Sequence, residues 1–214
     1  MGLTTRLRKP TRFWRSMAES TAVVADASVL INLNATARAA DILAALPYPV
    51  QVTDIAAQEL AEDRRSGRND RSALEALVGQ GHLHVAALSS AALSLFESLV
   101  VGAAVDTLDD GEAATLAHAA DQGRVPALDD RKGLRLCGSR FPFLRPVATV
   151  DLFRVESVAV ALGRAGLGDA VFLALRDARM RVMPHHVGWV IGLIGPDRAS
   201  LCPSLPRQPR LPPG

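Results

Sequence analysis

The stretch Val23-Val24-Ala25-Asp26-Ala27-Ser28-Val29-Leu30 decides the fold class of this chain. With Ala22 before them, its first three residues form a short apolar, β-branched run at residues 22–25, which favours a buried strand that ends at Asp26. A helical pattern follows from Ser28 to Leu46 and stops at Pro47. The stretch therefore predicts a strand that leads directly into a helix.

The same strand-then-helix pattern repeats along the chain. Further strand signals lie at residues 50–53, 83–88, 125–128 and 146–149. Helical patterns lie between and after them, at residues 54–60, 70–78, 90–101, 112–120, 152–162 and 168–179. This alternation predicts an α/β fold with a central parallel sheet covered on both faces. In such sheets, functional groups collect at the carboxyl ends of the strands.

The composition is that of a folded, soluble chain. Of the 214 residues, 49% are hydrophobic and 21% charged, which excludes global disorder. The two cysteines, Cys137 and Cys202, cannot form a disulfide framework or a four-thiolate zinc site, so a cytoplasmic location is expected. The tail lacks an apolar run of signal-peptide length, and the apolar stretch Val187–Gly195 is about half of a membrane span, so no membrane association is expected.

The chain divides into four segments. Residues 1–20 form a basic tail, 21–150 the main domain, 151–202 a helical extension packed on or beside it, and 203–214 a Pro-rich tail. The net charge is +2, and removing the five basic residues of the first segment leaves 2 − 5 = −3. We interpret this segment as a disordered arm, or as a translation start assigned too early, before Met17. The alternative is a segment that attracts nucleic acid.

Acidic residues follow the strands at successive strand-to-helix junctions. Asp26 ends the first strand, Glu59 lies one turn into the helix after the second, and Glu112 starts a later helix. Asp129 and Asp130 follow the strand at 125–128. Each acid alone also has a simple structural interpretation as a helix cap or a first-turn residue. Gathered at one sheet edge, they would repel one another unless a cation bound there.

The kind of cation follows from the kind of ligand. Oxygen ligands without a supporting set of cysteines and histidines favour Mg²⁺ or Mn²⁺ over zinc. His82, His84, His185 and His186 have no partner at zinc spacing. A carboxylate cluster with a hard metal most often serves phosphoryl transfer.

Four strings carry a family resemblance. They are residues 23–30, Gln58-Glu59-Leu60, Leu108-Asp109-Asp110-Gly111-Glu112-Ala113 with Leu116-Ala117-His118-Ala119, and Leu128-Asp129-Asp130-Arg131-Lys132. In order and spacing they resemble the four acidic motifs of PIN-domain nucleases, over about residues 21–150. The resemblance implies a three-layer α/β/α sandwich and metal-dependent endonucleolytic cleavage of RNA. It also implies the toxin role found in bacterial toxin–antitoxin pairs.

Carried over residue by residue, the resemblance assigns the catalytic and metal-holding acids to Asp26, Glu59, Glu112 and Asp130. Ser28 and Asp129 would be supporting residues. The chain departs from the pattern in two places. Glu112 stands where many of these toxins have Asp, although the Leu-Asp-x-Gly-Glu form resembles one branch of the family. Leu128 stands where a polar residue commonly precedes the fourth acid, and the neighbouring Asp129 makes Asp130 a preference.

Basic residues near these motifs have two interpretations. They either steer RNA phosphates toward the acids or form a solvated helix face. The candidates are Arg64, Arg65, Arg68, Arg131 and Lys132.

The expected partners are RNA, an antitoxin and a second copy of the chain. The apolar stretch around Trp189 either folds back on its own domain or forms an interface with one of these proteins. Dinucleotide-binding, receiver and haloacid-dehalogenase-like folds fit poorly, because the first strand is not followed by their motifs. The main alternative function is a PIN-like RNA-binding or protein-docking module without turnover.

Overall fold

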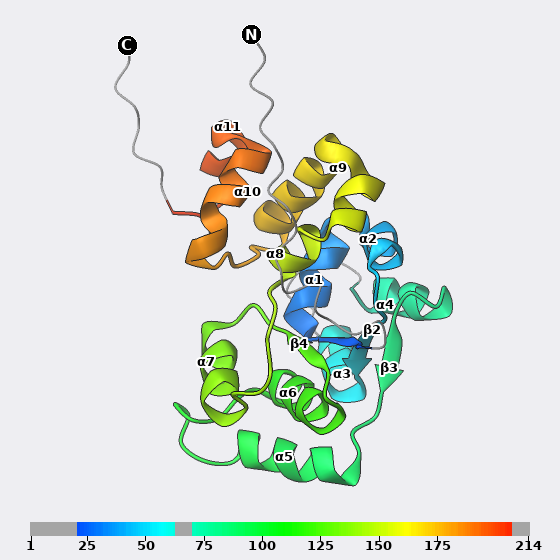
Figure 1. The fold of residues 1–214 in the computed structure, drawn as a ribbon, viewed down its shortest axis with the longest axis vertical. Helices are drawn as coiled ribbons and strands as arrows, with labels where there is room; N and C mark the ends of the chain where they lie inside the picture. Colours follow the sequence, from blue (N-terminus) through cyan, green and yellow to red (C-terminus); the bar gives the residue numbers. More distant parts are fainter. Residues whose placement is uncertain (1–20, 63–69, 207–214) are drawn as a thin grey trace.

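The computed structural model describes residues 21–62 and 70–206. The basic tail, residues 207–214 and the predicted steering residues Arg64, Arg65 and Arg68 lie outside the described residues. Within the described ranges, four strands form one all-parallel sheet in the order β3-β2-β1-β4 (Figure 1). They are β1 (Val23–Ala25), β2 (Val50–Thr53), β3 (His84–Ala86) and β4 (Val125–Ala127). The predicted α/β class with a parallel sheet is confirmed.

Helices connect and cover the strands. Those before β4 are α1 (Ala27–Ala35), α2 (Ala39–Ala45), α3 (Asp54–Glu62), α4 (Asp70–Gly79), α5 (Ser90–Val100) and α6 (Asp110–Gln122). Those after it are α7 (Arg131–Arg140), α8 (Thr149–Phe153), α9 (Glu156–Asp177), the 3₁₀ turn η1 (Pro184–His186), α10 (Val187–Ile194) and α11 (Pro196–Ser200).

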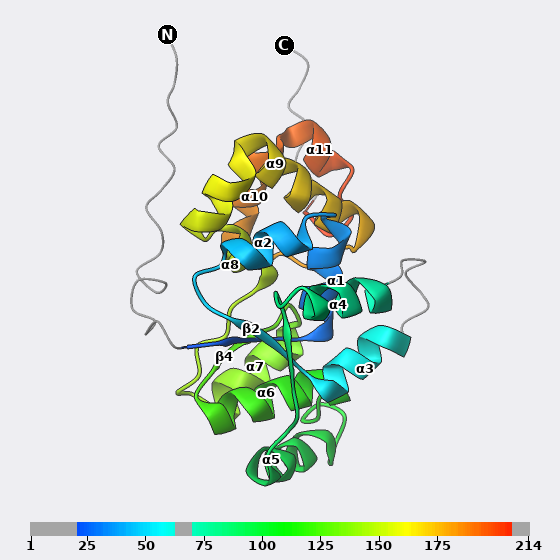
Figure 2. The same cartoon turned by 90° about the vertical axis from the view of Figure 1, so that its right-hand side faces the viewer.

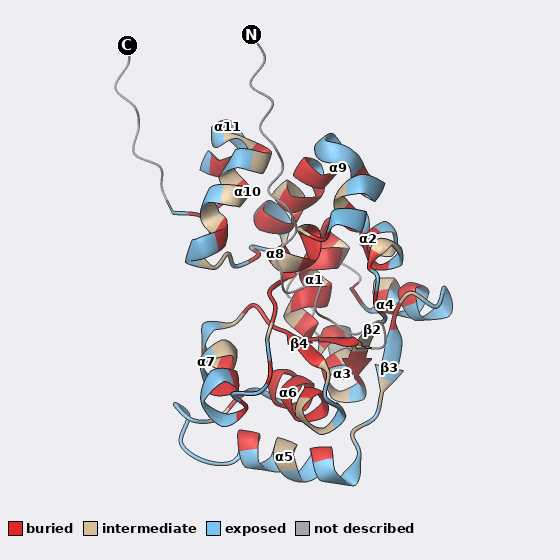
Figure 3. Ribbon diagram, viewed as in Figure 1, coloured by how far each residue is buried: buried red, intermediate tan, exposed pale blue. Residues whose placement is uncertain are grey.

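The sheet lies between two helical layers (Figure 2). Helix α6 packs against β1, β2 and β4 on one face, with α5 and α7 beside it, while α1, α2 and α8 cover the other face. Strand β1 explains why both faces are buried. Val23 and Ala25 belong to the larger apolar cluster, on the α1 face, whereas Val24 belongs to the cluster that includes Leu116 of α6. Side chains alternate along a strand, so three apolar residues serve both cores. The ribbon of the sheet between the two helical layers is largely buried (Figure 3).

The single helix predicted from Ser28 to Leu46 is wrong: the structure divides it into α1 and α2. The break lies at Thr36, whose hydroxyl donates to the Leu33 carbonyl at 2.6 Å and accepts from the Arg38 amide at 3.0 Å. Ala37 then adopts a left-handed conformation with φ of 56°. Local hydrogen bonds from a threonine side chain replace the helical pattern here.

Two predictions near the end of the chain also need correction. The strand predicted at 146–149 is a single bridge between Val147 and Ala127, after which Thr149 already begins α8. Leu205, which lies in the segment predicted as a tail from residue 203, is buried in the main core.

The helical extension completes the main core. Val150, Leu152 and Phe153 of α8 are fully buried, and α9 packs against α1 and α2. Among the described residues, α9 is the one helix long and apolar enough to cross a membrane. Gly163 interrupts it with non-helical angles (φ 65°, ψ 168°), and its inner side faces α1 and α2, as in a core helix.

The strand order places the candidate acids. The chain moves outward from β1 to β2 and β3 on one side, then returns to add β4 on the other side of β1. Such a reversal leaves a crevice outside the carboxyl ends of the two strands that flank it, where ligands bind in parallel sheets. Asp26 follows β1 and Asp130 follows β4, and the register pairs Ala25 with Ala127 at this edge.

Candidate active site

Asp26 lies at the centre of the acidic edge. It is the N-terminal cap of α1, and its Oδ2 accepts from the Ser28 amide at 3.2 Å and the Ser28 hydroxyl at 2.6 Å. Only 4% of the residue is exposed. Burial, and secondarily the charge of Asp109, raise the pKa of Asp26 to about 6, although the Ser28 bonds oppose the rise.

Glu112 comes from the first turn of α6 and points toward the start of α7. A Cβ placed on Gly133 would lie 3.5 Å from the Glu112 carboxylate, so this carboxylate rests against the first turn of α7. Glu112 is 8% exposed. Burial, followed by the charges of Asp109, Asp26 and Asp130, raises its pKa to about 8, and the charge of Lys132 only partly opposes them.

Glu59 extends from α3 to the first turn of α6. Its Oε1 accepts a hydrogen bond from the Gly111 amide at 2.9 Å, and a Cβ on Gly111 would lie 2.1 Å from its Oε2. Only glycine at position 111 allows this approach. Burial and then the charges of Asp109, Asp26 and Asp110 raise the pKa of Glu59, while the Gly111 amide opposes the rise.

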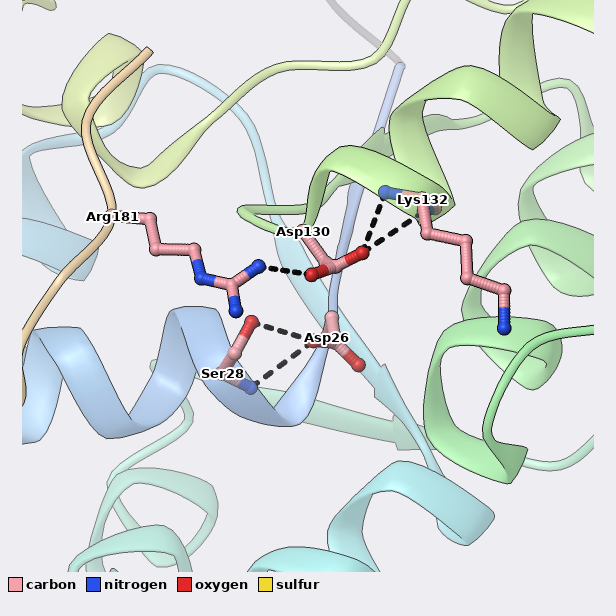
Figure 4. Close-up of polar contacts among 6 residues, drawn as sticks. Asp26, Ser28, Asp130, Lys132 and Arg181 are labelled. Atoms are coloured by element: carbon pink, nitrogen blue, oxygen red, sulfur yellow. Dashed lines mark hydrogen bonds and ion pairs between the residues drawn. The ribbon is translucent and has the colours of Figure 1, made fainter. Parts of the chain in front are cut away.

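The two adjacent acids after β4 have different roles. Asp129 is buried and accepts bonds from the Asn32 amide at 2.7 Å, the Thr149 backbone amide at 2.9 Å and the Thr149 hydroxyl. These partners lie in α1 and at the start of α8, so Asp129 ties the loop after β4 to both helices. Asp130 instead lies beside Asp26 (Figure 4). Asp130, the acid preferred from the sequence, is thus the one of the two that faces Asp26, and its catalytic role stays a prediction.

Asp130 uses both carboxylate oxygens. Its Oδ2 accepts from the backbone amides of Lys132 (2.6 Å) and Gly133 (3.3 Å) and so caps α7, and its Oδ1 forms an ion pair with Arg181. Burial acts to raise the pKa of Asp130, but the two amides and the Arg181 guanidinium outweigh it and lower the pKa. Asp130 is therefore the acid of the site that is most readily ionised.

Of the predicted steering residues, two are described. Arg131 is exposed at the start of α7. The side chain of Lys132 points away from the Asp130 carboxylate (Figure 4), and its charge acts on Glu112. Neither residue forms an ion pair with the predicted acids among the described residues.

The residues suit a hard cation that keeps part of its water shell. Among the described residues, no three Asp, Glu, His or Cys side chains lie close enough to enclose an ion by themselves. A Mg²⁺ site needs only one or two carboxylates, with water and substrate oxygens completing the shell. Asp26 and Glu112 provide two buried carboxylates that have no ion pair within the described residues, so a cation there would relieve their repulsion. The four-carboxylate ligand set remains a prediction.

Sequence reasoning missed Arg181 and the residues that hold Asp129. Arg181 lies in the segment after α9, 51 residues from its partner in the chain, and no local motif marks it. Asn32 shares the helix that Asp26 caps, but nothing in its surroundings indicates a partner 97 residues away. The role of Gly111 was within reach, because the glycine stands between Asp110 and Glu112 in the third motif.

Comparison with known proteins agrees with this geometry. A family model described as a PIN domain matches residues 22–141, which is more than half of the chain and includes all four predicted acids. No curated protein and no solved structure shows a significant match. The fold is therefore of a nuclease type, and the chain belongs to the PIN-domain family.

Proposed function

We propose that this protein is a Mg²⁺- or Mn²⁺-dependent endoribonuclease. The observation that carries the proposal is the burial of Asp26 and Glu112 together, with raised pKa values and no ion pair within the described residues. Proteins rarely keep such charges without a compensating group. A divalent cation supplies that compensation, and a polyanionic substrate explains why the acids are placed where one can bind.

Each side chain has a distinct role in this proposal. Asp26 and Glu112 hold the cation, which when bound lowers the pKa of water and stabilises charge on the scissile phosphate. Ser28 fixes the rotamer of Asp26 through two hydrogen bonds. Glu59, held by the Gly111 amide, orients water or completes the shell. Single-stranded or looped RNA fits best, because its backbone can bend into a site at a sheet edge.

The direct test is cleavage of an end-labelled single-stranded RNA by the full chain in Mn²⁺. Asp26→Asn and Glu112→Gln, or excess EDTA, should each lower the rate by about 10³-fold, because a metal supplies several kcal/mol of transition-state stabilisation. Asp169→Asn is the matched control. It removes the same charge from an exposed site on α9 and should leave the rate unchanged.

The same assay separates the alternatives. Full activity in EDTA, or in the Asp26→Asn variant, would refute the metal-dependent mechanism. Cleavage of single-stranded DNA but not RNA of the same sequence would refute the substrate class. RNA binding by the wild type without cleavage would support instead the module without turnover.

Three further proposals concern the cell. A cytoplasmic location is supported by the buried, free thiols of Cys137 and Cys202. A toxin role predicts that induced expression stops growth and that Asp26→Asn removes the effect.

A homodimer or an antitoxin would use α10, where Val190 and Ile194 pack inward while Trp189 is partly exposed. Light scattering of the wild type and Trp189→Glu tests the homodimer, which is refuted if both are folded monomers.

A further inference from the structure

The segment between α9 and α10 is fixed where it leaves α9. The amides of Ala178 and Met180 both donate to the Ala174 carbonyl, at 3.2 and 3.0 Å, and Arg179 between them adopts a left-handed conformation with φ of 54°. This arrangement closes a helix and turns the chain sharply. Met180 is 1% exposed, so the residue that follows starts from a rigid anchor.

The other end of the segment is also fixed. His186 is 1% exposed, and its ring nitrogens lie 3.1 Å from an Asp151 carboxylate oxygen and 3.2 Å from an Arg154 guanidinium nitrogen. Asp151 belongs to α8, and Arg154 is the residue directly after α8. These contacts therefore fix the His186 end of the segment to α8. The segment from Met180 to His186 is thus fixed at both ends, and Arg181 directly follows the first fixed residue.

Arg181 is the residue that this path brings to the acids. It enters from the extension and points its guanidinium at Asp130, above Asp26 and Ser28 (Figure 4). The Arg181 side chain is 62% exposed although it is paired with Asp130. Within the described residues this pair is its one hydrogen bond, so most of its five donors face solvent at the mouth of the site.

The positive charge of Arg181 lies next to acids that would repel a phosphate. When they are ionised, Asp26, Glu59 and Glu112 create a negative field that repels a phosphate even if a cation neutralises part of it. Among the described residues, Arg181 is the one cationic side chain in an ion pair with an acid of this edge. A guanidinium can bond a carboxylate on one side and a phosphate on the other, which an ammonium does less well.

We propose that Arg181 binds a backbone phosphate of the substrate strand beside the cleavage position, so that the C-terminal extension forms one wall of the active site. This inference rests on the proposed nuclease function. Asp130 is then the positioning residue that aims Arg181. The substrate-binding surface extends beyond residues 22–141, the part of the chain that the family model matches.

The test measures RNA binding apart from catalysis. A fluorescein-labelled single-stranded RNA is titrated with the full chain in EDTA at several salt concentrations, with fluorescence anisotropy as the readout. Arg181→Ala should raise the Kd by about tenfold and lower the slope of log Kd against log salt by about 0.7, the value for one phosphate contact. Arg181→Lys should keep most of the slope because it keeps the charge.

Arg198→Ala is the matched control, because Arg198 is also an exposed arginine of the extension, paired with Asp169. Its Kd should stay within about twofold of the wild type, since it contacts no acid of the site. The thermal midpoint of each variant shows that it is folded. In Mn²⁺, Arg181→Ala should raise KM for RNA far more than it lowers kcat, the pattern expected when uniform binding is lost.

Two results overturn the proposal for Arg181 while the nuclease function stands. In the first, the wild type cleaves RNA, and the Arg181→Ala variant binds RNA with the same Kd and the same salt slope as the wild type. The other is faster cleavage by Arg181→Ala, which would make the ion pair with Asp130 an inhibitory contact. A wild type that neither binds nor cleaves RNA refutes the nuclease function and this inference together.

Discussion

Replacing Asp26 by asparagine should stabilise the protein in the absence of metal while removing its activity. Asp26 is 4% exposed, and the pKa of its carboxyl group is raised to about 6 from 3.8. Asparagine has nearly the same shape, and its Oδ1 can still accept the bonds from Ser28. The substitution therefore removes the buried charge and leaves the cap of α1.

The size and the sign of this change in stability follow from the shift in the pKa of Asp26. A group whose pKa is raised on folding adds stability below its unfolded pKa and loses that contribution as pH rises through the folded value. For Asp26 the loss runs from about pH 4 to about pH 6 and amounts to about 3 kcal/mol, at 1.36 kcal/mol per unit. At pH 7.5 in EDTA, Asp26→Asn should therefore be more stable than the wild type by up to about 3 kcal/mol.

The assay is urea denaturation of both proteins in EDTA at pH 4 and pH 7.5, repeated at pH 7.5 in saturating Mn²⁺. The difference should be small at pH 4, because both side chains are then largely neutral. Mn²⁺ at 100 times its Kd should stabilise the wild type by about 2.7 kcal/mol and the variant much less. The exposed Asp169→Asn, as control, should change the free energy of unfolding by less than about 1 kcal/mol at either pH.

The reasoning is refuted if Asp26→Asn is no more stable than the wild type at pH 7.5 in EDTA, because Asp26 would then carry no desolvated charge. Equal stabilisation of both proteins by Mn²⁺ would place the cation elsewhere. Either result would remove the physical basis for the metal site.

Three further predictions concern other residues of the site. Gly111→Ala should displace the carboxylate of Glu59 and lower cleavage by about tenfold or more with the fold intact, whereas Gly138→Ala, with no atom within 4 Å of the added Cβ, should leave the rate unchanged. Asp129→Ala should lower the free energy of unfolding by about 3 kcal/mol, measured by urea denaturation, because it leaves buried donors without an acceptor. Mn²⁺ affinity, measured by calorimetry, should rise between pH 6 and 8 with release of protons, because the pKa of Glu112 is raised to about 8 and a metal ligand must be deprotonated. An affinity that stays constant over this range would contradict the assignment of Glu112 as a metal ligand.

Local sequence determined the fold class and the positions of the acids along it. Short apolar runs such as Val23-Val24-Ala25, each followed by a helical pattern, are signals that span only a few residues, and they gave all four strands of the sheet. The carboxyl ends of parallel strands meet at one edge, so Asp26 and Asp130 could be placed together before any contact was known. The break at Thr36 escaped prediction because two hydrogen bonds of the Thr36 hydroxyl outweighed a continuous helical period.

Only the tertiary structure decided which acids meet and what surrounds them. Asp129 and Asp130 are chemically identical neighbours, and the choice between them depends on Asn32 and Thr149, which lie 97 and 20 residues from Asp129. Arg181 reaches Asp130 because α9 closes at Arg179 and Met180 is buried, and neither event leaves a periodic pattern near the acids. Hydrophobic periodicity reports which face of an element is buried, whereas these contacts depend on how separate elements pack against one another.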